Sequence, residues 1–286
     1  YAFSLIVFCR EHSLKIKDHI KLDTGMSRIG FCSSTDSEYA LIKSTLGLEC
    51  LDFVGVFTHL SSADTNDEES ILYTKMQMQT FNNCVLKLKN DGKTFKYIHM
   101  QNSAAILKYD APECNYSRAG IIMYGISPSE QMSDLGFLPV MSIKSVVSMV
   151  KTIKAGTAVS YGRNFVAKTD MKVATVPIGY ADGYSRLLSN KGKMIVNGTL
   201  VNIIGNVCMD QVMLDVSEVN GVKQGDIVTI LGSDGGLFIT ADDIAREIGT
   251  IGYEIVCVVG RRVPRIYIKN SKTVEVVDYI LDSPTV

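Results

Sequence analysis

The sequence predicts an α/β fold, consisting of part of a (β/α)8 barrel of the TIM type followed by a mostly β C-terminal domain. In the first half of the chain, short apolar runs alternate with helix-like stretches, a pattern typical of a parallel sheet covered by helices. After Pro139, β-branched runs separated by turn pairs dominate. We therefore assign residues 1–135 to the C-terminal part of a barrel and residues 136–286 to a β-rich domain.

The first half contains four expected βα units. Apolar runs at 20–22, 53–57 and 97–100 predict strands, and a fourth unit is expected to begin near 121–123. The clearest helix runs from about 68 to 89, because its apolar residues repeat with helical spacing; they are Ile71, Met78, Phe81, Val85 and Leu88.

Four units are half of a barrel, and a complete barrel takes roughly 250 residues. We therefore expect that about 100 residues of the barrel precede this sequence. The first residues have no basic stretch and no small-residue cleavage site, so they predict a helix cut by the boundary rather than a signal peptide.

The second half predicts strands and hairpins, with one helix between them. Turn pairs such as Asn197-Gly198 and Asp234-Gly235 connect the runs. Thr240 is the expected N-cap of the helix, and Ile248-Gly249 is its expected end. The β-branched runs are 145–150, 172–177, 193–196, 200–204, 212–216 and 227–231.

Composition excludes several classes of function. The net charge of −1 gives no reason to expect a nucleic-acid partner or an anionic membrane surface, and no apolar run approaches the length of a membrane span. The seven cysteines are widely spaced, without a C-x-x-C pair. This favours reduced thiols in a cytoplasmic protein, with neither a disulfide framework nor a metal site.

Polar residues follow the predicted strands, where barrel enzymes hold their active sites. Lys21 and Arg28 flank one strand end, and His59 follows the next strand. Ser103 begins a short helix, where a hydroxyl caps the helix or contacts a phosphate, and Gly120 exposes a backbone N–H to an anion. Taken alone, the segment from Lys21 to Arg28 fits a solvated loop better than a site, and Ser103 usually only caps its helix. His59 fits a catalytic or a surface role equally well.

In the second half, Tyr180 lies in a turn between glycines, and the Cys208-Met209-Asp210 segment adds polar groups. A tyrosine in a β domain usually packs in the core, but one flanked by Gly and Asp in a turn is a better candidate for a site.

The order of these segments resembles the alanine racemase family from residue 19 to about 270. Eight segments occur in family order: KLDTGMSRIGF, FTHLSSAD, HMQNSAAIL, SRAGIIMYG, VSYGRNF, IGYADGYSR, GNVCMDQ and YEIVCVVGRRVPRIY. The resemblance implies a pyridoxal 5'-phosphate (PLP) enzyme that interconverts L- and D-alanine by two-base proton transfer. It also implies supply of D-alanine for peptidoglycan and a head-to-tail homodimer with shared active sites.

The resemblance further assigns roles to residues of the first half. Arg28 approaches the phenolic oxygen of PLP and the substrate, and Lys21, often carbamylated in the family, positions it. His59 stacks on the pyridine ring. The phosphate ligands are Ser103, Gly120 and Ile121.

Arg118 matches the family arginine that faces the pyridine nitrogen. Because arginine does not give up its proton, this nitrogen stays unprotonated and the ring is a weaker electron sink, which limits side reactions such as transamination.

In the second half, Tyr180 matches the second acid/base group, which the partner subunit supplies. An unperturbed tyrosine, with a pKa near 10, is a poor base at neutral pH, so cationic or desolvating neighbours must tune it. Met209 and Asp210 match residues at the substrate carboxylate.

Three departures from the family pattern leave alternatives open. No string like K-A-N-A-Y-G, which carries the PLP lysine in the family, occurs here, so we expect these residues alone to be inactive and the complete parent to racemise alanine. Arg261 stands where the family often has a phosphate-contacting Tyr, and Asn206 where it often has Arg. The alternatives are the racemase domain of a serine/alanine racemase of glycopeptide resistance, with serine as a further substrate, or an inactive PLP-barrel remnant.

Overall fold

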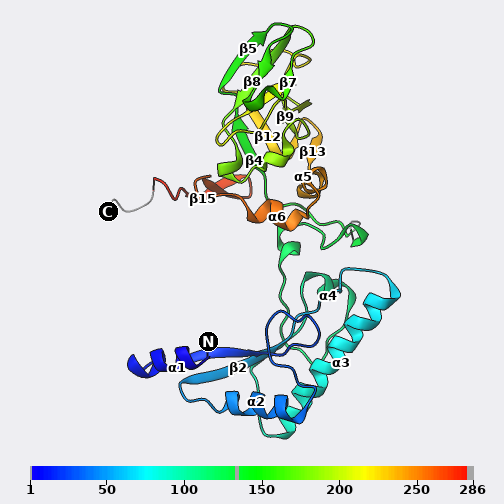
Figure 1. Cartoon of the computed structure of the whole chain (residues 1–286), viewed down its shortest axis with the longest axis vertical. Coiled ribbons are helices and arrows are strands. Elements are labelled where there is room, and N and C mark those ends of the chain that lie inside the picture. The colour runs from blue at the N-terminus through cyan, green and yellow to red at the C-terminus, as the bar shows by residue number, and fades with distance from the viewer. Residues whose placement is uncertain (1, 133–134, 282–286) are drawn as a thin grey trace. The chain divides into compact units, whose positions relative to one another are not determined.

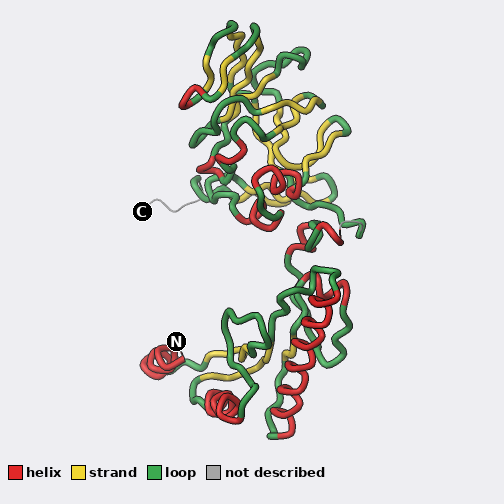
Figure 2. Tube along the Cα trace, turned by 45° about the vertical axis from the view of Figure 1, so that its right-hand side comes forward, coloured by secondary structure: helices red, strands yellow, loops and turns green. Residues whose placement is uncertain are grey.

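The computed structural model describes residues 2–132 and 135–281 (Figures 1 and 2). The chain divides into two compact units, Tyr1–Leu138 and Pro139–Val286, whereas the sequence pattern put the boundary after residue 135. Among the described residues, no helix has the length and apolar character that a membrane crossing requires.

Unit 1 is built on a parallel sheet of three strands in the order β1-β2-β3. The strands are β1 (Ile16–Lys21), β2 (Leu51–Phe57) and β3 (Tyr97–His99). The helices are α1 (Ala2–Glu11), α2 (Asp36–Leu46), α3 (Glu68–Asn90) and α4 (Ser103–Lys108), with 3-10 turns η1 (Ile121–Tyr124) and η2 (Glu130–Met132). The predicted alternation of parallel strands and helices is confirmed.

The expectation of a fourth strand near 121–123 is wrong, because these residues form η1. The N–H of Met123 bonds to Gly120 O at 2.9 Å and that of Gly125 to Ile122 O at 3.1 Å. Gly125 ends the turn at a left-handed φ of 71°, which glycine adopts without steric cost. The backbone donors are therefore used locally and do not extend the sheet.

One face of the sheet carries the hydrophobic core of unit 1. Side chains of successive strand residues point to opposite faces, and Ile20, Leu22, Val56 and Met100 pack against α2 and α3. The helices contribute Tyr39, Ile42, Phe81, Cys84 and Leu88. The opposite face of the sheet is thereby left for polar and aromatic side chains.

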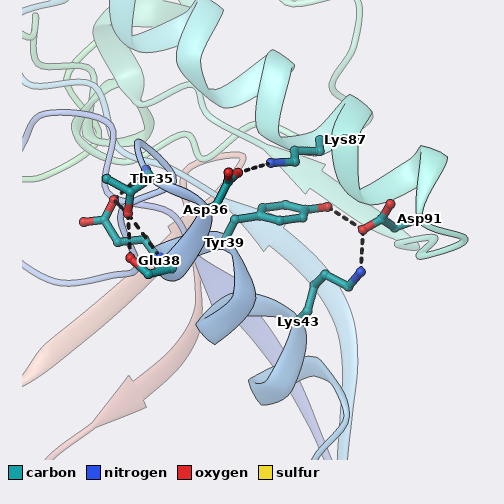
Figure 3. A network of polar contacts seen from close by, with 8 residues as sticks. Thr35, Asp36, Glu38, Tyr39, Lys43, Lys87 and Asp91 are labelled. Carbon is teal, nitrogen blue, oxygen red and sulfur yellow. Dashed lines mark hydrogen bonds and ion pairs between the residues drawn. The ribbon is translucent and has the colours of Figure 1, made fainter.

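Polar contacts hold α2 against α3 at the surface (Figure 3). The hydroxyl of Tyr39 donates to Asp91 at 3.1 Å, and Lys43 pairs with the same carboxylate at 2.8 Å. Burial and the bond to Asp91 raise the pKa of Tyr39 to about 12. The ammonium of Lys87 lies 3.9 Å from the centre of the Tyr39 ring and 3.5 Å from Asp36. These contacts fix the helices that support the sheet.

Unit 2 is mostly β. Its larger sheet has the order β10-β9-β12-β13, with β4 also paired to β12, and a second sheet has the order β11-β8-β5. The strands are β4 (Ile143–Val146), β5 (Met149–Ile153), β6 (Ala158–Val159), β7 (Phe165–Val166), β8 (Met171–Val176), β9 (Lys193–Val196), β10 (Thr199–Asn202), β11 (Val212–Asp215), β12 (Ile227–Asp234), β13 (Leu237–Ile239), β14 (Arg265–Lys269) and β15 (Lys272–Val277).

Short helical elements interrupt these strands. The helices are α5 (Ala241–Ile248) and α6 (Gly252–Cys257), and the 3-10 turns are η3 (Tyr161–Arg163), η4 (Tyr180–Asp182) and η5 (Arg186–Leu188). The predicted helix is confirmed as α5, which Thr240 caps and left-handed Gly249 ends.

Two sequence predictions for the strands have different outcomes. The predicted hairpin at Asn197-Gly198 is confirmed between β9 and β10, with φ angles of 48° and 70° that suit a type I′ turn. The run 145–150 is two strands rather than one. Val147 N bonds to Asp226 O and Ser148 N to Thr175 O, both at 2.8 Å, so the chain leaves β12 for β8 between these two residues.

Candidate active site

The polar face of the unit 1 sheet centres on the ring of Phe57 at the end of β2. The imidazole of His99 stacks on it, with centroids 5.1 Å apart and an interplanar angle of 12°. The guanidinium carbon of Arg118 lies 5.4 Å and the ammonium of Lys21 5.7 Å from the ring centre. Three nitrogen-bearing side chains thus converge at the carboxyl ends of parallel strands, where barrel enzymes place their chemistry.

Arg118 contacts most of the other members of this group. Nη2 donates to Thr58 O at 2.8 Å and Met100 O at 3.2 Å, and lies 3.2 Å from Nδ1 of His59. Nη1 donates to Nδ1 of His99 and, at 3.4 Å, to its carbonyl oxygen. Because these acceptors are all neutral, the guanidinium keeps its full positive charge, and burial lowers its pKa.

Both histidines beside Arg118 are held neutral. Burial, followed by the charges of Arg118, Arg28 and Lys21, lowers the pKa of His59 to about 4. Burial, followed by Arg118 and His19, lowers the pKa of His99 to about 4. A guanidinium only donates, so Nδ1 of each ring is an acceptor and the proton lies on Nε2.

These pKa shifts predict that unit 1 loses stability in mild acid. Below pH 6.5 the unfolded chain gains protons at these histidines while the folded chain does not, so the free energy of unfolding falls as the pH drops towards 4. His99 is 8% exposed, and its shift alone corresponds to a loss of roughly 2 kcal/mol between pH 7 and pH 5. Denaturant unfolding at a series of pH values measures this slope.

His99→Asn isolates the effect, because it keeps an acceptor near Nδ1 but does not titrate in this range. We expect it to flatten the slope between pH 5 and 6.5, whereas His12→Asn, at an exposed position just after α1, leaves the slope unchanged. Equal slopes in the wild type and His99→Asn would contradict the assignment.

The loop after β1 is ordered by Asp23 and brings Arg28 near this group. The Asp23 carboxylate accepts the backbone N–H groups of Gly25, Met26 and Ser27 at 3.0 to 3.1 Å. Burial raises the pKa of Asp23, but the three backbone hydrogen bonds lower it by more, so the net shift is downward. Arg28 itself is exposed, although its charge acts on Lys21 and His59.

Lys21 is buried at the root of the same loop. It is 8% exposed, and its ammonium donates to Leu22 O at 2.7 Å. Burial lowers its pKa; Asp23 opposes the shift, and Arg118 and Arg28 add to it.

Ser103 and Gly120 form a polar turn at the start of α4. The expected capping role of the serine belongs instead to Asn102, whose side chain accepts Ala105 N at 3.0 Å. Ser103 is 5% exposed, and its hydroxyl accepts Gly120 N at 2.9 Å. A Cβ on Gly120 would meet only this hydroxyl, at 3.4 Å, so the backbone there is open. Ile121 follows at the start of η1.

In unit 2, Tyr180 begins η4 and lies against the Cys208-Met209 segment. Tyr180 N bonds to Cys208 O at 3.1 Å and Ala181 N to Met209 O at 3.0 Å. A Cβ on Gly179 would lie 2.3 Å from both carbonyl oxygens, so only glycine permits this approach. The Tyr180 side chain is 44% exposed and free to reach a ligand.

Arg262 connects the Tyr180 turn to Asp210. Its Nε donates to Asp182 at 2.7 Å and its Nη2 to Asp210. These two bonds raise the pKa of Arg262. The Asp182 carboxylate also accepts the N–H of Gly179 at 2.8 Å. One carboxylate therefore binds both Arg262 and the residue before Tyr180.

We predict that Arg262→Gln lowers the turnover of the racemase proposed below by roughly 10- to 100-fold, because an error of about 1 Å in a reacting group costs up to ~10²-fold. Arg262→Lys should fall between this variant and the wild type, since it retains the charge but loses the forked contact. Initial rates of D-alanine formation measure the effect. Arg246→Gln, in an exposed ion pair of α5, is the matched control. Equal rates for Arg262→Gln and the control would reject the bracing role.

The structure brings the candidate residues together within each unit. Unit 1 joins Lys21, Arg28, His59 and Arg118. Gly120 and Ile121 follow Arg118 closely in the chain, and Ser103 is hydrogen-bonded to Gly120. Unit 2 joins Tyr180, Met209 and Asp210. Sequence reasoning missed Phe57, His99 and His19 in unit 1 and the role of Arg262 in unit 2. Phe57 lies two residues after Gly55 on β2, so both residues are on the same face of the sheet. This alternation is a signal that could have placed Phe57 on the polar face. Among residues 2–132 and 135–281, no three His, Cys, Asp or Glu side chains come together as a metal site.

The fold and the polar face define the class of the protein, namely an enzyme with a barrel-like α/β domain followed by a β-rich domain. The sequence matches the family model for the alanine racemase N-terminal domain over residues 2–128 and that for the C-terminal domain over residues 140–267. The chain therefore belongs to the alanine racemase family, a family of PLP-dependent isomerases.

Individual relatives agree with this assignment. Alanine racemase 1 of Clostridium acetobutylicum is 39% identical over 282 residues, covering 98% of this chain and 72% of the relative. The alanine racemase of Citrifermentans bemidjiense is 45% identical over 254 residues, covering 87% of this chain and 66% of the relative.

Solved structures give the same result. The Bacillus anthracis alanine racemase with bound L-Ala-P superposes with a TM-score of 0.90 at 36% identity, covering 98% of this chain and 72% of that one. The Bartonella henselae alanine racemase with covalently bound pyridoxal phosphate has a TM-score of 0.76 at 28% identity, covering 93% and 70%.

Proposed function

We propose that this protein interconverts L- and D-alanine with PLP as cofactor, and so supplies D-alanine for peptidoglycan. The observation that carries the proposal is the set of contacts around Arg118, a half-buried guanidinium that meets only neutral acceptors and lies between two neutral histidines. Named alanine racemases at 39% and 45% identity support the substrate.

The residues of unit 1 fit PLP. The Ser103 hydroxyl and the backbone N–H of Ile121 suit a phosphate group, which binds well to hydroxyl and backbone donors. The N–H of Gly120 donates to the Ser103 oxygen, and the bare Gly120 leaves room for the phosphate to approach. Arg118 would face the ring nitrogen and His59 the ring. When bound, PLP supplies the electron sink that lets the α-proton of an amino acid leave.

Each of the proposed site residues has a separate role toward the cofactor or the substrate. Arg118, as a permanent donor, keeps its proton and leaves the facing nitrogen unprotonated. Arg28 would approach the phenolic oxygen and the substrate, and Met209 and Asp210 would lie at the substrate carboxylate. Tyr180 moves a proton on one face of the α-carbon. A second base acts on the other face.

Lys21 is proposed to be carbamylated. Burial lowers its pKa, which favours the neutral amine that reacts with carbon dioxide. The amine nitrogen would bond to the carbon of carbon dioxide and release one proton to solvent. The resulting carbamate anion, at the root of the loop that carries Arg28, would hold that cation in place.

A homodimer with shared active sites is proposed, in which Tyr180 acts at the cofactor of the partner subunit. The free state of the seven cysteines supports a cytoplasmic location.

A racemase for serine as well as alanine is the second candidate, which the departures at Asn206 and Arg261 leave open. The Asn206 side chain is 5% exposed, accepts Asn164 Nδ2 at 3.0 Å and donates to Tyr161 O at 2.6 Å. A neutral amide thus occupies a position where the family often has arginine. Arg261, the other departure, lies with its guanidinium 5.7 Å from the Tyr279 ring.

The test is racemisation by the protein expressed from its complete gene and loaded with PLP. Chiral chromatography should detect D-alanine from L-alanine, and the same protein stripped of PLP is the control. A higher kcat/KM for L-serine than for L-alanine would favour the second candidate. Lack of turnover with L-alanine, L-serine and L-lysine would reject the racemase and leave a PLP-barrel remnant without activity.

A further inference from the structure

A third histidine, His19 on β1, reaches Arg118 through His99. His19 and Gly55 are paired residues of β1 and β2, and Gly55 also pairs with Tyr97 on β3. A Cβ on Gly55 would lie 2.5 Å from two atoms of the His19 ring. The imidazole therefore lies over the bare glycine backbone and crosses β2. Its Nδ1 is 3.0 Å from Nε2 of His99.

Stacked aromatic rings fix the planes of both imidazoles. His19 stacks on Tyr97, with centroids 5.5 Å apart and an angle of 18°. Tyr97 in turn meets Tyr116 edge to face at 4.8 Å. His99 stacks on Phe57. Because the ring planes are set in this way, the direction of each ring N–H is set by the tautomer alone.

The hydrogen bonds permit a single arrangement of protons. Arg118 has only donors, so Nδ1 of His99 is bare and its proton is on Nε2. That N–H points at Nδ1 of His19, which must then be the acceptor. The chain of donors therefore runs from Arg118 through His99 to His19.

We propose that His19, lying in the space that Gly55 leaves, is a positioning residue that locks His99 in its Nε2–H tautomer and thereby fixes the direction of the Arg118 guanidinium. The opposite tautomer of His99 would present an N–H to another N–H and push the guanidinium away. The inference deepens the proposed function, on which the role of Arg118 rests.

The direct test reads the tautomers in the wild-type chain. The sequence has four histidines, so 15N-labelled histidine gives a resolvable set of imidazole signals, with exposed His12 as reference. At pH 8 we expect Nδ1 bare and Nε2 protonated in His99, with Nδ1 of His19 as the acceptor and a slowly exchanging Nε2 proton on His99. A proton on Nδ1 of His99 would overturn the proposal without any variant.

Variants then separate hydrogen bonding from packing. In His19→Leu, the Nε2 proton of His99 should exchange at least about tenfold faster, and kcat for alanine should fall about tenfold with KM within about twofold. His19→Asn keeps an acceptor near Nδ1 and should restore both readouts. Asn as damaging as Leu would overturn the proposal.

Gly55→Ala tests the space under the ring. The added methyl must displace His19, so this variant should behave as His19→Leu does. Gly47→Ala is the matched control, because a Cβ there makes only an ordinary contact of 3.4 Å with Ser44 O. Unchanged His99 signals in both Gly55→Ala and His19→Leu would reject the role of His19.

The outcome is distinguishable from failure of the proposed function. If the tautomers are as stated but the complete protein does not racemise alanine, the function fails and the lock on Arg118 stands. If racemisation occurs while His99 carries its proton on Nδ1, the lock fails alone.

Discussion

Arg118→Leu is expected to lower kcat for alanine racemisation by at least about 10²-fold, the effect of removing one preorganised donor from an active site. It should also weaken unit 1 by about 3 kcal/mol, because the carbonyl groups of Thr58 and Met100 and two imidazole nitrogens lose their donor. Initial rates and denaturant unfolding measure the two effects separately.

Two further substitutions bracket this result. Arg118→Lys keeps the charge but cannot serve acceptors in several directions, so both effects should be smaller yet clear. Arg10→Leu removes an arginine of α1 that forms an exposed ion pair with Glu49 at 3.5 Å, and it should change neither quantity. Turnover of Arg118→Leu within twofold of the wild type would remove Arg118 from the mechanism.

Tyr180→Phe is expected to stop proton removal from one face of the α-carbon. The variant lacks the hydroxyl but keeps the ring and the turn. Exchange of the α-proton of L-alanine with D2O should fall by at least about 10³-fold, near the upper range for one acid/base group, while the exchange of D-alanine continues. Proton NMR of each enantiomer in D2O follows both reactions.

The matched control for this substitution is Tyr267→Phe on β14, an exposed tyrosine far along the chain. It should exchange both enantiomers at the wild-type rate. PLP binding should be equal in the two variants, since Tyr180 does not belong to unit 1. Equal slowing of both enantiomers in Tyr180→Phe would show that the tyrosine does not serve a single face.

Local features of the fold could be predicted from the sequence. The β9–β10 hairpin depends on an Asn-Gly pair that tolerates positive φ, and α5 depends on a Thr cap followed by acidic residues. The apolar run at 121–123 misled because its neighbours Gly120 and Gly125 permit a 3-10 turn. The β14–β15 hairpin escaped notice, because its turn residues Asn270 and Ser271 adopt positive φ without glycine.

The polar contacts of the site could not be predicted in this way. His19 and His99 are 80 positions apart, and so are Asp182 and Arg262. Such pairs depend on the register of the strands and the course of the loops, and no local pattern encodes them. Family resemblance supplied Arg118 and Tyr180 as candidates, but not the neutral acceptors around the first or the arginine that braces the second.

The close approach at Gly179 has a consequence for how this enzyme can change. The turn that carries Tyr180 and the segment that carries Met209 touch through their main chains, with no side chain between them to absorb a shift. The two segments that carry the proposed proton-transferring Tyr180 and the proposed carboxylate contact therefore move together. Laboratory evolution towards bulkier amino acids should leave this pair of segments untouched and accumulate its substitutions elsewhere.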